Sequence, residues 1–390
     1  MLLSDRIQRV AASATMTMTQ AAHDLHAQGR DIISLSVGEP DFAPPKHILK
    51  AANDAMANGH TGYTRADGIA ALKDAIIAKF ARDNDLSFDR SQINVSPGGK
   101  AVIWNALAVT VGLGDEVIIP TPCWVSYPDM VKMTGATPIL LPGALDFKIT
   151  PEALSQAISR HTRWLILNSP SNPTGAVYTA EELLALADIL RDHPQIMILC
   201  DDIYEHLVYG DARFATIASV APDLANRTLT MNGVSKAYAM TGFRIGYAGG
   251  PTWLIDAMRK FIGQTTSCPA APSQWAAIAA LNGDHSFLND WRETYAVRGQ
   301  ALAAALNGSG LVCGRPDGAF YLFADCRDAL ARKGLDSDTD LALAILQDIG
   351  VATVPGSAFY APNHLRLSYA AGMDVLMEAG DRLSDYLASD

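Results

Sequence analysis

The chain has 390 residues, of which 49% are apolar and 18% are charged, and its formal net charge is −11. This length exceeds one ordinary hydrophobic core and predicts two domains, while the composition is that of a folded globular protein. An acidic chain without a local run of Lys and Arg offers no basic face, so we expect neither nucleic acid nor membrane lipid as a partner.

The cysteines and the apolar stretches favour the cytoplasm. The five cysteines include no CxxC pair, and an odd number in a chain of this size favours reduced thiols. The first residues, MLLSDRIQRV, lack the apolar core of a signal peptide. The longest apolar stretch, residues 101–113, is too short and too interrupted to span a bilayer, and it predicts a buried helix.

Short runs of Val, Ile and Leu then alternate with helix-like segments. Thr179-Ala-Glu-Glu182 has the pattern of a helix N-terminus, and Thr150-Pro151 has another. Alternating strands and helices predict an α/β fold with a mostly parallel sheet that is covered on both faces. The predicted strands are Val117–Ile119, Trp164–Leu167, Ile196–Cys200, Thr228–Met231 and Ile245–Ala248.

The pattern changes near residue 285. Phe287–Leu306 predicts a long amphipathic helix, and Gly318–Ala324 and His364–Tyr369 predict short strands before a final helix from about residue 373. We therefore expect a large domain over residues 46–285. Residues 1–45 together with residues 286–390 should form a smaller α+β domain.

Several common motifs are missing. Gly99-Lys100 is followed by Ala101 instead of the Ser or Thr of a nucleotide P-loop, and Gly112-Leu-Gly114 lacks the third glycine of a dinucleotide fingerprint. Zinc-type spacings of Cys and His are absent, as is GxSxG. We therefore expect no metal, and Rossmann-type hydride transfer and serine hydrolysis lose their usual support.

Three successive predicted strands are each followed by a chemically useful side chain. Asn172 follows the first strand, Asp201 ends the second and Lys236 follows the third. Each residue alone is most often a turn, a helix cap or a surface charge. Because ligands bind at the carboxyl ends of parallel strands, the joint placement of Asn, Asp and Lys predicts a cofactor site at that edge.

These segments resemble the class I and II aminotransferases, fold-type-I enzymes that use pyridoxal 5′-phosphate. The resemblance runs from about residue 30 to the C-terminus, and Pro122-Cys-Trp-Val-Ser-Tyr-Pro128 is closest to the prokaryotic aspartate aminotransferase branch. It implies a large domain with a mostly parallel seven-stranded sheet between helices, and a smaller α+β domain. It rests on Ser36-Val-Gly38-Glu-Pro-Asp-Phe42, Asn172-Pro-Thr-Gly175, Asp201-Asp-Ile-Tyr204, Ser235-Lys236, Met240-Thr-Gly-Phe-Arg244 and Leu365-Arg366-Leu-Ser-Tyr369.

The resemblance implies three catalytic residues. Lys236 would form a Schiff base with the cofactor aldehyde and later carry a proton as a general acid and base. Asp201 would keep the pyridine nitrogen protonated, and Asp202 is the neighbour that could be mistaken for it. Tyr204 would donate a hydrogen bond to the phenolic oxygen of the ring, and Asn172 would bind the same oxygen.

The resemblance also implies a phosphate site and a stacking residue. Ser235 and Arg244 would supply a hydroxyl and a positive charge to the phosphate, and Trp124 would stack on the cofactor ring. Backbone N–H groups at a helix N-terminus would also face the phosphate, namely those of Gly99, Lys100 and Ala101.

The remaining implied residues concern a partner subunit and the substrate. Tyr63 resembles the tyrosine that reaches the phosphate of the neighbouring subunit, which implies a homodimer with shared active sites. Arg366 would clamp the α-carboxylate of the substrate in a bidentate bond. The backbone of Gly38 would lie close to the same carboxylate, with Trp124 and Asn172 also binding substrate.

We therefore expect an aminotransferase that moves the amino group of an L-amino acid, aspartate-like or aromatic, to a 2-oxo acid such as 2-oxoglutarate by a ping-pong mechanism. The alternative is another enzyme of the same fold and cofactor, such as a carbon–sulfur β-lyase, because the cofactor carries the chemistry of both. A dicarboxylic donor needs a second cation, and Arg65, Lys100 and Arg259 all stay open for that role.

Overall fold

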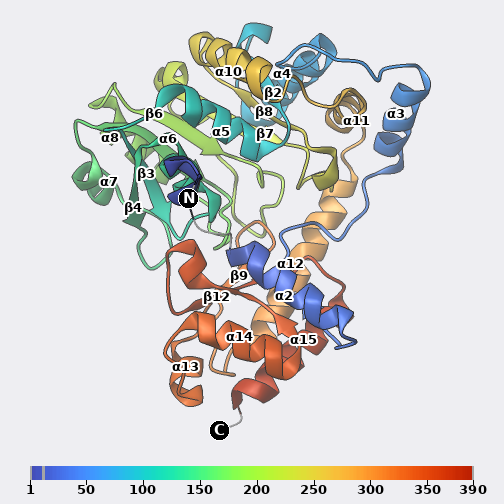
Figure 1. Ribbon diagram of the computed structural model, residues 1–390, viewed down its shortest axis with the longest axis vertical. Coiled ribbons are helices and arrows are strands. Elements are labelled where there is room, and N and C mark those ends of the chain that lie inside the picture. The colour runs from blue at the N-terminus through green and yellow to red at the C-terminus, as the bar shows by residue number, and fades with distance from the viewer. Residues whose placement is uncertain (1, 11–13, 389–390) are drawn as a thin grey trace.

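The computed structural model describes residues 2–10 and 14–388. Over these residues the chain forms one seven-stranded sheet, one three-stranded sheet and one pair of short strands. Figure 1 shows the large sheet and its helices at the top and the smaller sheets at the bottom, with the long helix α12 (Phe287–Leu306) running between them.

The seven-stranded sheet has the order β2-β8-β7-β6-β5-β3-β4. Only β8 runs antiparallel to its neighbours, and the other neighbouring strands in the sheet are parallel. The predicted α/β fold with a mostly parallel sheet is thus confirmed. The strands are β2 (Ile93–Ser96), β3 (Glu116–Thr121), β4 (Thr137–Pro142), β5 (Thr162–Asn168), β6 (Met197–Asp201), β7 (Thr228–Gly233) and β8 (Gly246–Gly249).

Helices cover both faces of this sheet, which explains why its strands read as continuous apolar runs. Successive side chains of a strand point to opposite faces, so in β5 Trp164 and Ile166 join one apolar core while Leu165 and Leu167 join the other. The first core is shared with α5 (Gly99–Thr110), α6 (Ser126–Thr134) and α10 (Thr252–Thr265). The second is shared with α7 (Pro151–Ala157), α8 (Ala180–Arg191) and α9 (Ile217–Val220).

The β2 edge of the sheet has a core of its own, in which Ile93 and Val95 pack against three further helices. These helices are α3 (Lys46–Ala57), α4 (Ala70–Asn84) and α11 (Ala271–Asn282). The remaining short elements of the chain are α1 (Asp5–Gln8), η1 (Arg90–Gln92), η2 (Pro222–Arg227), η3 (Thr241–Phe243) and η4 (Gly356–Phe359).

Both predicted helix starts are capped as expected. At the start of α8 the Thr179 hydroxyl accepts the N–H of Glu182, and the Glu182 carboxylate accepts the N–H of Thr179. At the start of α7 the Thr150 hydroxyl accepts the N–H of Ala153 at 3.2 Å. Each cap satisfies otherwise unpaired helix donors, which stabilises the helix by about 1 kcal/mol.

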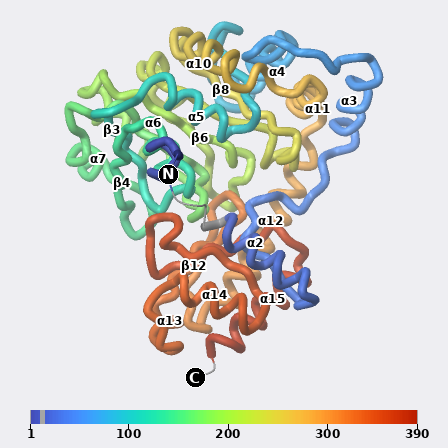
Figure 2. Tube along the Cα trace, viewed as in Figure 1, coloured from blue at the N-terminus to red at the C-terminus, as the bar shows by residue number. Residues whose placement is uncertain are grey.

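The smaller sheets join the two ends of the chain. Ile33 in β1 (Ile33–Ser34) pairs in parallel with Val351 in β10 (Val351–Ala352). In Figure 2 the blue N-terminal trace of α2 (Ala14–Ala27) accordingly lies beside the red C-terminal trace. The other elements here are β9 (Tyr321–Asp325), β11 (Val354–Pro355), β12 (His364–Ser368), α13 (Arg327–Lys333), α14 (Asp338–Ile349) and α15 (Met373–Ala388).

One predicted strand begins later than expected. The sequence predicts a strand over Gly318–Ala324, whereas β9 begins at Tyr321. Ala319 has a φ of 57°, in the left-handed region, and this conformation interrupts an extended chain. Tyr321 is therefore the first residue of the strand.

Two further observations bear on the expected setting of the protein. Among the helices within residues 2–10 and 14–388, none combines the length and the apolar character needed to cross a membrane. All five cysteines are free thiols.

Candidate active site

A cavity of about 520 Å³ opens where β5, β6 and β7 end. Its lining includes the last residues of β5 and β6, Asn168 and Asp201, and the segment that follows β7. Tyr321 and Arg366 reach it from the three-stranded sheet. Eleven of the predicted site residues line this cavity: Gly38, Gly99, Lys100, Trp124, Asn172, Asp201, Tyr204, Ser235, Lys236, Arg244 and Arg366.

Lys236 lies at the centre of these residues. Its Nζ donates a hydrogen bond of 2.6 Å to the carbonyl oxygen of Gly38 and lies 5.8 Å from the centre of the Tyr204 ring. Burial lowers the pKa of Lys236 to about 8, with the nearby Arg366 and Arg244 adding to the effect and Glu39 opposing it. A larger share of the amine is therefore neutral near pH 8 than for an exposed lysine, and the neutral amine is the nucleophilic form.

Asp201 is the acid that faces the cavity, and Asp202 does not line it. Successive side chains at a strand end point to opposite faces, which separates the two carboxylates. Burial raises the pKa of Asp201 to about 6, against the opposing effect of a hydrogen bond from the Tyr127 hydroxyl at 2.5 Å. The sequence-based choice of Asp201 over Asp202 thus agrees with the geometry.

The cavity also has lining residues that were not among the predicted site residues, and Tyr127 and Asn168 are two of them. The Asn168 amide donates to the carbonyl oxygen of Asp201 at 2.8 Å, and its oxygen accepts the N–H of Asn172 at 2.9 Å. Its place at the end of an apolar run, paired in register with Asp201, is a signal that could have identified it. Tyr127 comes from α6, and no local spacing in the sequence connects it to Asp201.

At another side of the cavity, Arg244 lies against a glycine. A Cβ atom on Gly98 would lie 2.1 Å from the Arg244 guanidinium, and Gly98 has a φ of 90°, a backbone conformation that favours glycine. Gly99 and Lys100 begin α5 and line the cavity. Ala101, which was also predicted to face the phosphate, does not line it, and its N–H donates to the carbonyl oxygen of Gly98 at 3.0 Å.

Arg366 is almost completely buried, with an exposed fraction of 2%. Its two terminal nitrogens donate to the side-chain oxygen of Asn172 at 3.1 Å and to the carbonyl oxygen of Ser36 at 2.6 Å. Its Nε has no hydrogen-bond partner among the described residues. No carboxylate within the part of the chain that the structure describes forms an ion pair with this buried cation, so the site is suited to an anion from outside the chain.

The structure distinguishes the three cations that the sequence left open as partners of a second substrate carboxylate. Lys100 lines the cavity, with Nζ 4.9 Å from the centre of the Trp124 ring. A guanidinium nitrogen of Arg65 lies 3.6 Å from the Asp67 carboxylate, and one of Arg259 lies 4.0 Å from it. Neither arginine lines the cavity. Lys100 is therefore the one of the three that lines the cavity.

Besides Ala101, Tyr63 is the predicted site residue that does not line the cavity of its own chain. Its exposed fraction is 93%, and it does not line the cavity. Such exposure of a large aromatic side chain fits a residue that contacts another molecule.

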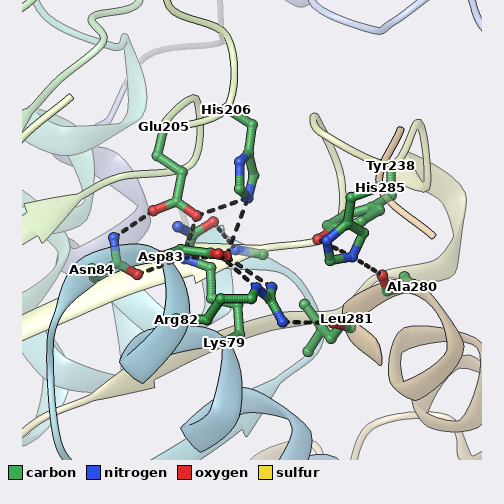
Figure 3. Close-up of polar contacts among 12 residues, drawn as sticks. Lys79, Arg82, Asp83, Asn84, Glu205, His206, Tyr238, Ala280, Leu281 and His285 are labelled. Carbon is green, nitrogen blue, oxygen red and sulfur yellow. Dashed lines mark hydrogen bonds and ion pairs between the residues drawn. The ribbon is translucent and has the colours of Figure 1, made fainter. Parts of the chain in front are cut away.

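Beside Tyr204, a buried polar cluster connects the loop after β6 to α4 (Figure 3). The Lys79 ammonium pairs with the Glu205 carboxylate, whose other oxygen accepts a hydrogen bond of 2.7 Å from Asn84. His206 lies 3.1 Å from the same carboxylate. Burial alone would raise the pKa of Glu205, but the charge of Lys79 holds it below its ordinary value.

Three side chains of this cluster are close enough together to hold a metal ion. The possible ligand atoms of Asp83, Glu205 and His206 lie within 4.8 Å of one another. The Lys79 ammonium already supplies the positive charge for Glu205 and lies 3.9 Å from Asp83. We therefore describe the cluster as an ion-pair network.

Comparisons with known proteins agree with this geometry. The family described as "Aminotransferase class I and II" matches residues 30–379. The chain is 47% identical to the aspartate/prephenate aminotransferase of Cereibacter sphaeroides, covering 99% of this chain and 98% of that protein. Among solved structures it is similar to the aspartate aminotransferase of Rhizobium meliloti, with a TM-score of 0.96 and 43% identity over 99% of both chains.

A second similar structure is the aspartate aminotransferase of Thermus thermophilus with maleate, at a TM-score of 0.93 and 39% identity over 98% of this chain and 99% of that one. Both the family match and these likenesses extend over nearly the whole chain, so they include the sheet, the cavity and the smaller sheets together. This chain belongs to the class I and II aminotransferases of fold type I, and it is a pyridoxal-phosphate-dependent aminotransferase.

Proposed function

We propose that this aminotransferase uses L-aspartate as an amino donor and a dicarboxylic 2-oxo acid such as 2-oxoglutarate as the acceptor. The observation that carries the proposal is that two further cations, Arg366 and Lys100, line the same cavity as Lys236 and Arg244. Arg366 binds the α-carboxylate and Lys100 binds the distal carboxylate. Aspartate and 2-oxoglutarate each have two carboxylates, so one pair of cations serves both substrates.

The residues of the cavity fit pyridoxal phosphate. Among the described residues, the hydrogen-bond partners of the Asp201 carboxylate are the Tyr127 hydroxyl and the Ile203 N–H, and neither of them is a cation. A buried carboxylate without a cationic partner costs free energy, and a protonated pyridine nitrogen supplies that partner. The start of α5, together with Ser235 and Arg244, offers hydrogen-bond donors and positive charge to a phosphate.

The chain's own groups then have distinct tasks. Pyridoxal phosphate, when bound, supplies the aldehyde and the electron-withdrawing ring. Lys236 provides the amine that holds this aldehyde and afterwards carries the proton to and from the substrate Cα. Asp201 would hold the proton on the ring nitrogen, while Tyr204 and Asn172 would bind the phenolic oxygen and Trp124 would stack on the ring.

The names of similar proteins support a dicarboxylic substrate. One relative is named an aspartate/prephenate aminotransferase, and one similar structure is named as containing maleate, a dicarboxylate. Prephenate is a 2-oxo acid that also has a second carboxylate. The same two cations would accept it, so prephenate is a second candidate acceptor for this chain.

The direct test is an absorbance experiment on the cofactor-loaded protein. L-Aspartate alone should convert the visible band to the amine form, and 2-oxoglutarate should restore it. The Lys100→Met variant should lose about tenfold to a hundredfold in kcat/KM for aspartate, because it lacks a charge-assisted bond, while its value for alanine should change little.

Arg259→Met is the matched control, since this cation is exposed and lies outside the cavity. It should leave the preference for aspartate over alanine unchanged. An equal loss for aspartate and alanine in Lys100→Met would contradict the proposed role of Lys100. Release of pyruvate or ammonia without formation of the amine would contradict transamination itself.

We further propose a cytoplasmic homodimer in which Tyr63 reaches the partner subunit's phosphate site, supported by the high exposure of Tyr63 and by the five free thiols. We also propose that residues 46–285 form a large domain, and that residues 1–45 with 286–390 form a small one. All strands of the seven-stranded sheet fall within the first range, and the pairing of β1 with β10 connects the two parts of the second.

A further inference from the structure

Tyr321 is a cavity residue to which neither the sequence motifs nor the roles proposed above give a task. It is 1% exposed, and its hydroxyl lies 2.8 Å from the hydroxyl of Tyr204. Tyr204 follows β6 of the seven-stranded sheet, whereas Tyr321 is the first residue of β9 in the three-stranded sheet. This hydrogen bond therefore connects the two sheets inside the cavity.

The direction of this hydrogen bond is set when Tyr204 acts on the cofactor. A hydroxyl group has one proton and can both donate and accept. Once Tyr204 donates its proton to the phenolic oxygen of the ring, its own oxygen can only accept, and Tyr321 is the neighbouring hydroxyl at hydrogen-bond distance. A hydroxyl that accepts one hydrogen bond becomes a better donor in the next, so Tyr321 strengthens the bond that Tyr204 makes.

The ring of Tyr321 has a second contact. The guanidinium carbon of Arg366 lies 4.6 Å from the ring centre, within the range of a cation–π interaction. Arg366 is buried, and among the described residues only its terminal nitrogens have hydrogen-bond partners, so the aromatic face is part of what keeps its charge in place.

Room for the Tyr321 hydroxyl depends on Gly38. A Cβ atom at position 38 would lie 2.7 Å from this hydroxyl, which is closer than real Cβ atoms approach. The carbonyl oxygen of Gly38 also accepts the hydrogen bond from Lys236. One small residue thus lets the Tyr321 hydroxyl approach Tyr204 beside the reactive lysine.

We propose that Tyr321 is a positioning residue for the aminotransferase reaction: its hydroxyl orients and polarises Tyr204, and its ring supports Arg366. The inference rests on the proposed role of Tyr204 at the phenolic oxygen and on that of Arg366 at the substrate carboxylate. It adds a residue that touches both groups and acts through them.

Two substitutions separate the two contacts. Tyr321→Phe removes the hydroxyl and keeps the ring, while Tyr321→Leu removes both. The first readout is the pH titration of the visible band of the cofactor-loaded protein. In Tyr321→Phe, the weaker hydrogen bond from Tyr204 leaves more negative charge on the phenolic oxygen. This charge holds the proton on the adjacent nitrogen of Lys236 more tightly, so the midpoint of the pH titration should rise by about half a pH unit.

The second readout is steady-state kinetics with L-aspartate. Tyr321→Phe should lower kcat with little change in KM, because the ring still supports Arg366. Tyr321→Leu should in addition raise KM by up to about tenfold, because the cation–π contact to the carboxylate-binding residue is lost.

Tyr209→Phe is the control for a purely structural effect. The Tyr209 hydroxyl is buried and donates to the carbonyl oxygen of Ala319, near β9, but Tyr209 does not line the cavity. It should lower the thermal unfolding temperature without moving the titration midpoint. An unshifted midpoint in Tyr321→Phe, or the same shift in Tyr209→Phe, would overturn the inference. A parent protein that forms no visible band with pyridoxal phosphate would instead refute the proposed site, and the inference with it.

Discussion

The Tyr127 hydroxyl donates a hydrogen bond of 2.5 Å to the buried carboxylate of Asp201. Tyr127 comes from α6 and Asp201 from the end of β6, so the contact depends on how this helix packs over the sheet. The bond favours the ionised form of a carboxylate whose pKa burial has raised to about 6. It therefore keeps Asp201 available to a cationic ring nitrogen at neutral pH.

Removal of this hydroxyl should weaken cofactor binding in a pH-dependent manner. In Tyr127→Phe the pKa of Asp201 should rise above its present value of about 6. The affinity of the apo protein for pyridoxal phosphate should fall about tenfold at neutral pH and further as the pH is lowered, because a charge-assisted bond is lost and the carboxyl group is protonated. Absorbance titrations of apo protein at several pH values measure this.

Tyr178→Phe is a suitable control for that measurement. The Tyr178 hydroxyl is also buried, but it accepts a hydrogen bond from the backbone N–H of Ile149 and lies outside the main cavity. Its loss should leave the affinity for pyridoxal phosphate unchanged at every pH. Parallel titration curves for Tyr127→Phe and the parent would show that Tyr127 does not act on Asp201.

The lowered pKa of Lys236 predicts how cofactor attachment depends on pH. The rate at which apo protein gains the visible band should rise as the pH increases through about 8 and then level off, because the neutral amine attacks the aldehyde. Lys236→Ala should bind pyridoxal phosphate without this band and lose turnover by several orders of magnitude. The exposed Lys260→Ala serves as control, and substantial turnover in Lys236→Ala would exclude the assignment.

The ion pair of Lys79 and Glu205 should stabilise the fold at neutral pH and lose this effect at acidic pH. The folded-state pKa of Glu205 lies below its ordinary value, so the stabilisation is fully present above the ordinary range of a glutamate and is lost as the pH falls through the folded-state pKa. Lys79→Met should lower the free energy of unfolding by about 3–5 kcal/mol at neutral pH, because it leaves an unpaired buried carboxylate.

Denaturant unfolding at neutral and at acidic pH measures this difference. The double variant Lys79→Met with Glu205→Gln should recover part of the lost stability at neutral pH, since it removes the unpaired charge as well. At acidic pH the Lys79→Met variant and the parent should be closer in stability. An equal difference at both pH values would contradict the titration of Glu205.

A mixed dimer tests whether Tyr63 is shared between subunits. Tyr63→Ala and Lys236→Ala homodimers should each have low activity. A heterodimer of the two has one site with both lesions and one site with intact Lys236 and the partner subunit's Tyr63. Co-expression or subunit exchange should therefore restore activity to about half of the parent value per heterodimer, because the pairing leaves one of two sites whole. Failure to restore any activity would argue against shared sites.

Local sequence patterns predicted much of the fold. The N-terminal caps of α7 and α8 and the bounds of α12 agree with the structure because capping and helical periodicity depend on residues only a few positions apart. The predicted start of β9, at Gly318, lies three residues before the observed start at Tyr321, because nothing in the local pattern reveals the left-handed backbone of Ala319. The pairing of β1 with β10 was likewise outside the reach of periodicity.

The sequence by itself predicted five of the seven strands of the large sheet, without β2 and β4. It also identified the residues at the ends of three of these strands, and so predicted that Asn172, Asp201 and Lys236 lie at one edge of a parallel sheet. Only the tertiary structure decided which groups act on these residues. Tyr127 reaches Asp201 across 74 positions of sequence, and Tyr321 reaches Tyr204 across 117. Such contacts depend on how helices and sheets pack together, and packing leaves no periodic signal in the chain, so the supporting residues of the site became visible only in three dimensions.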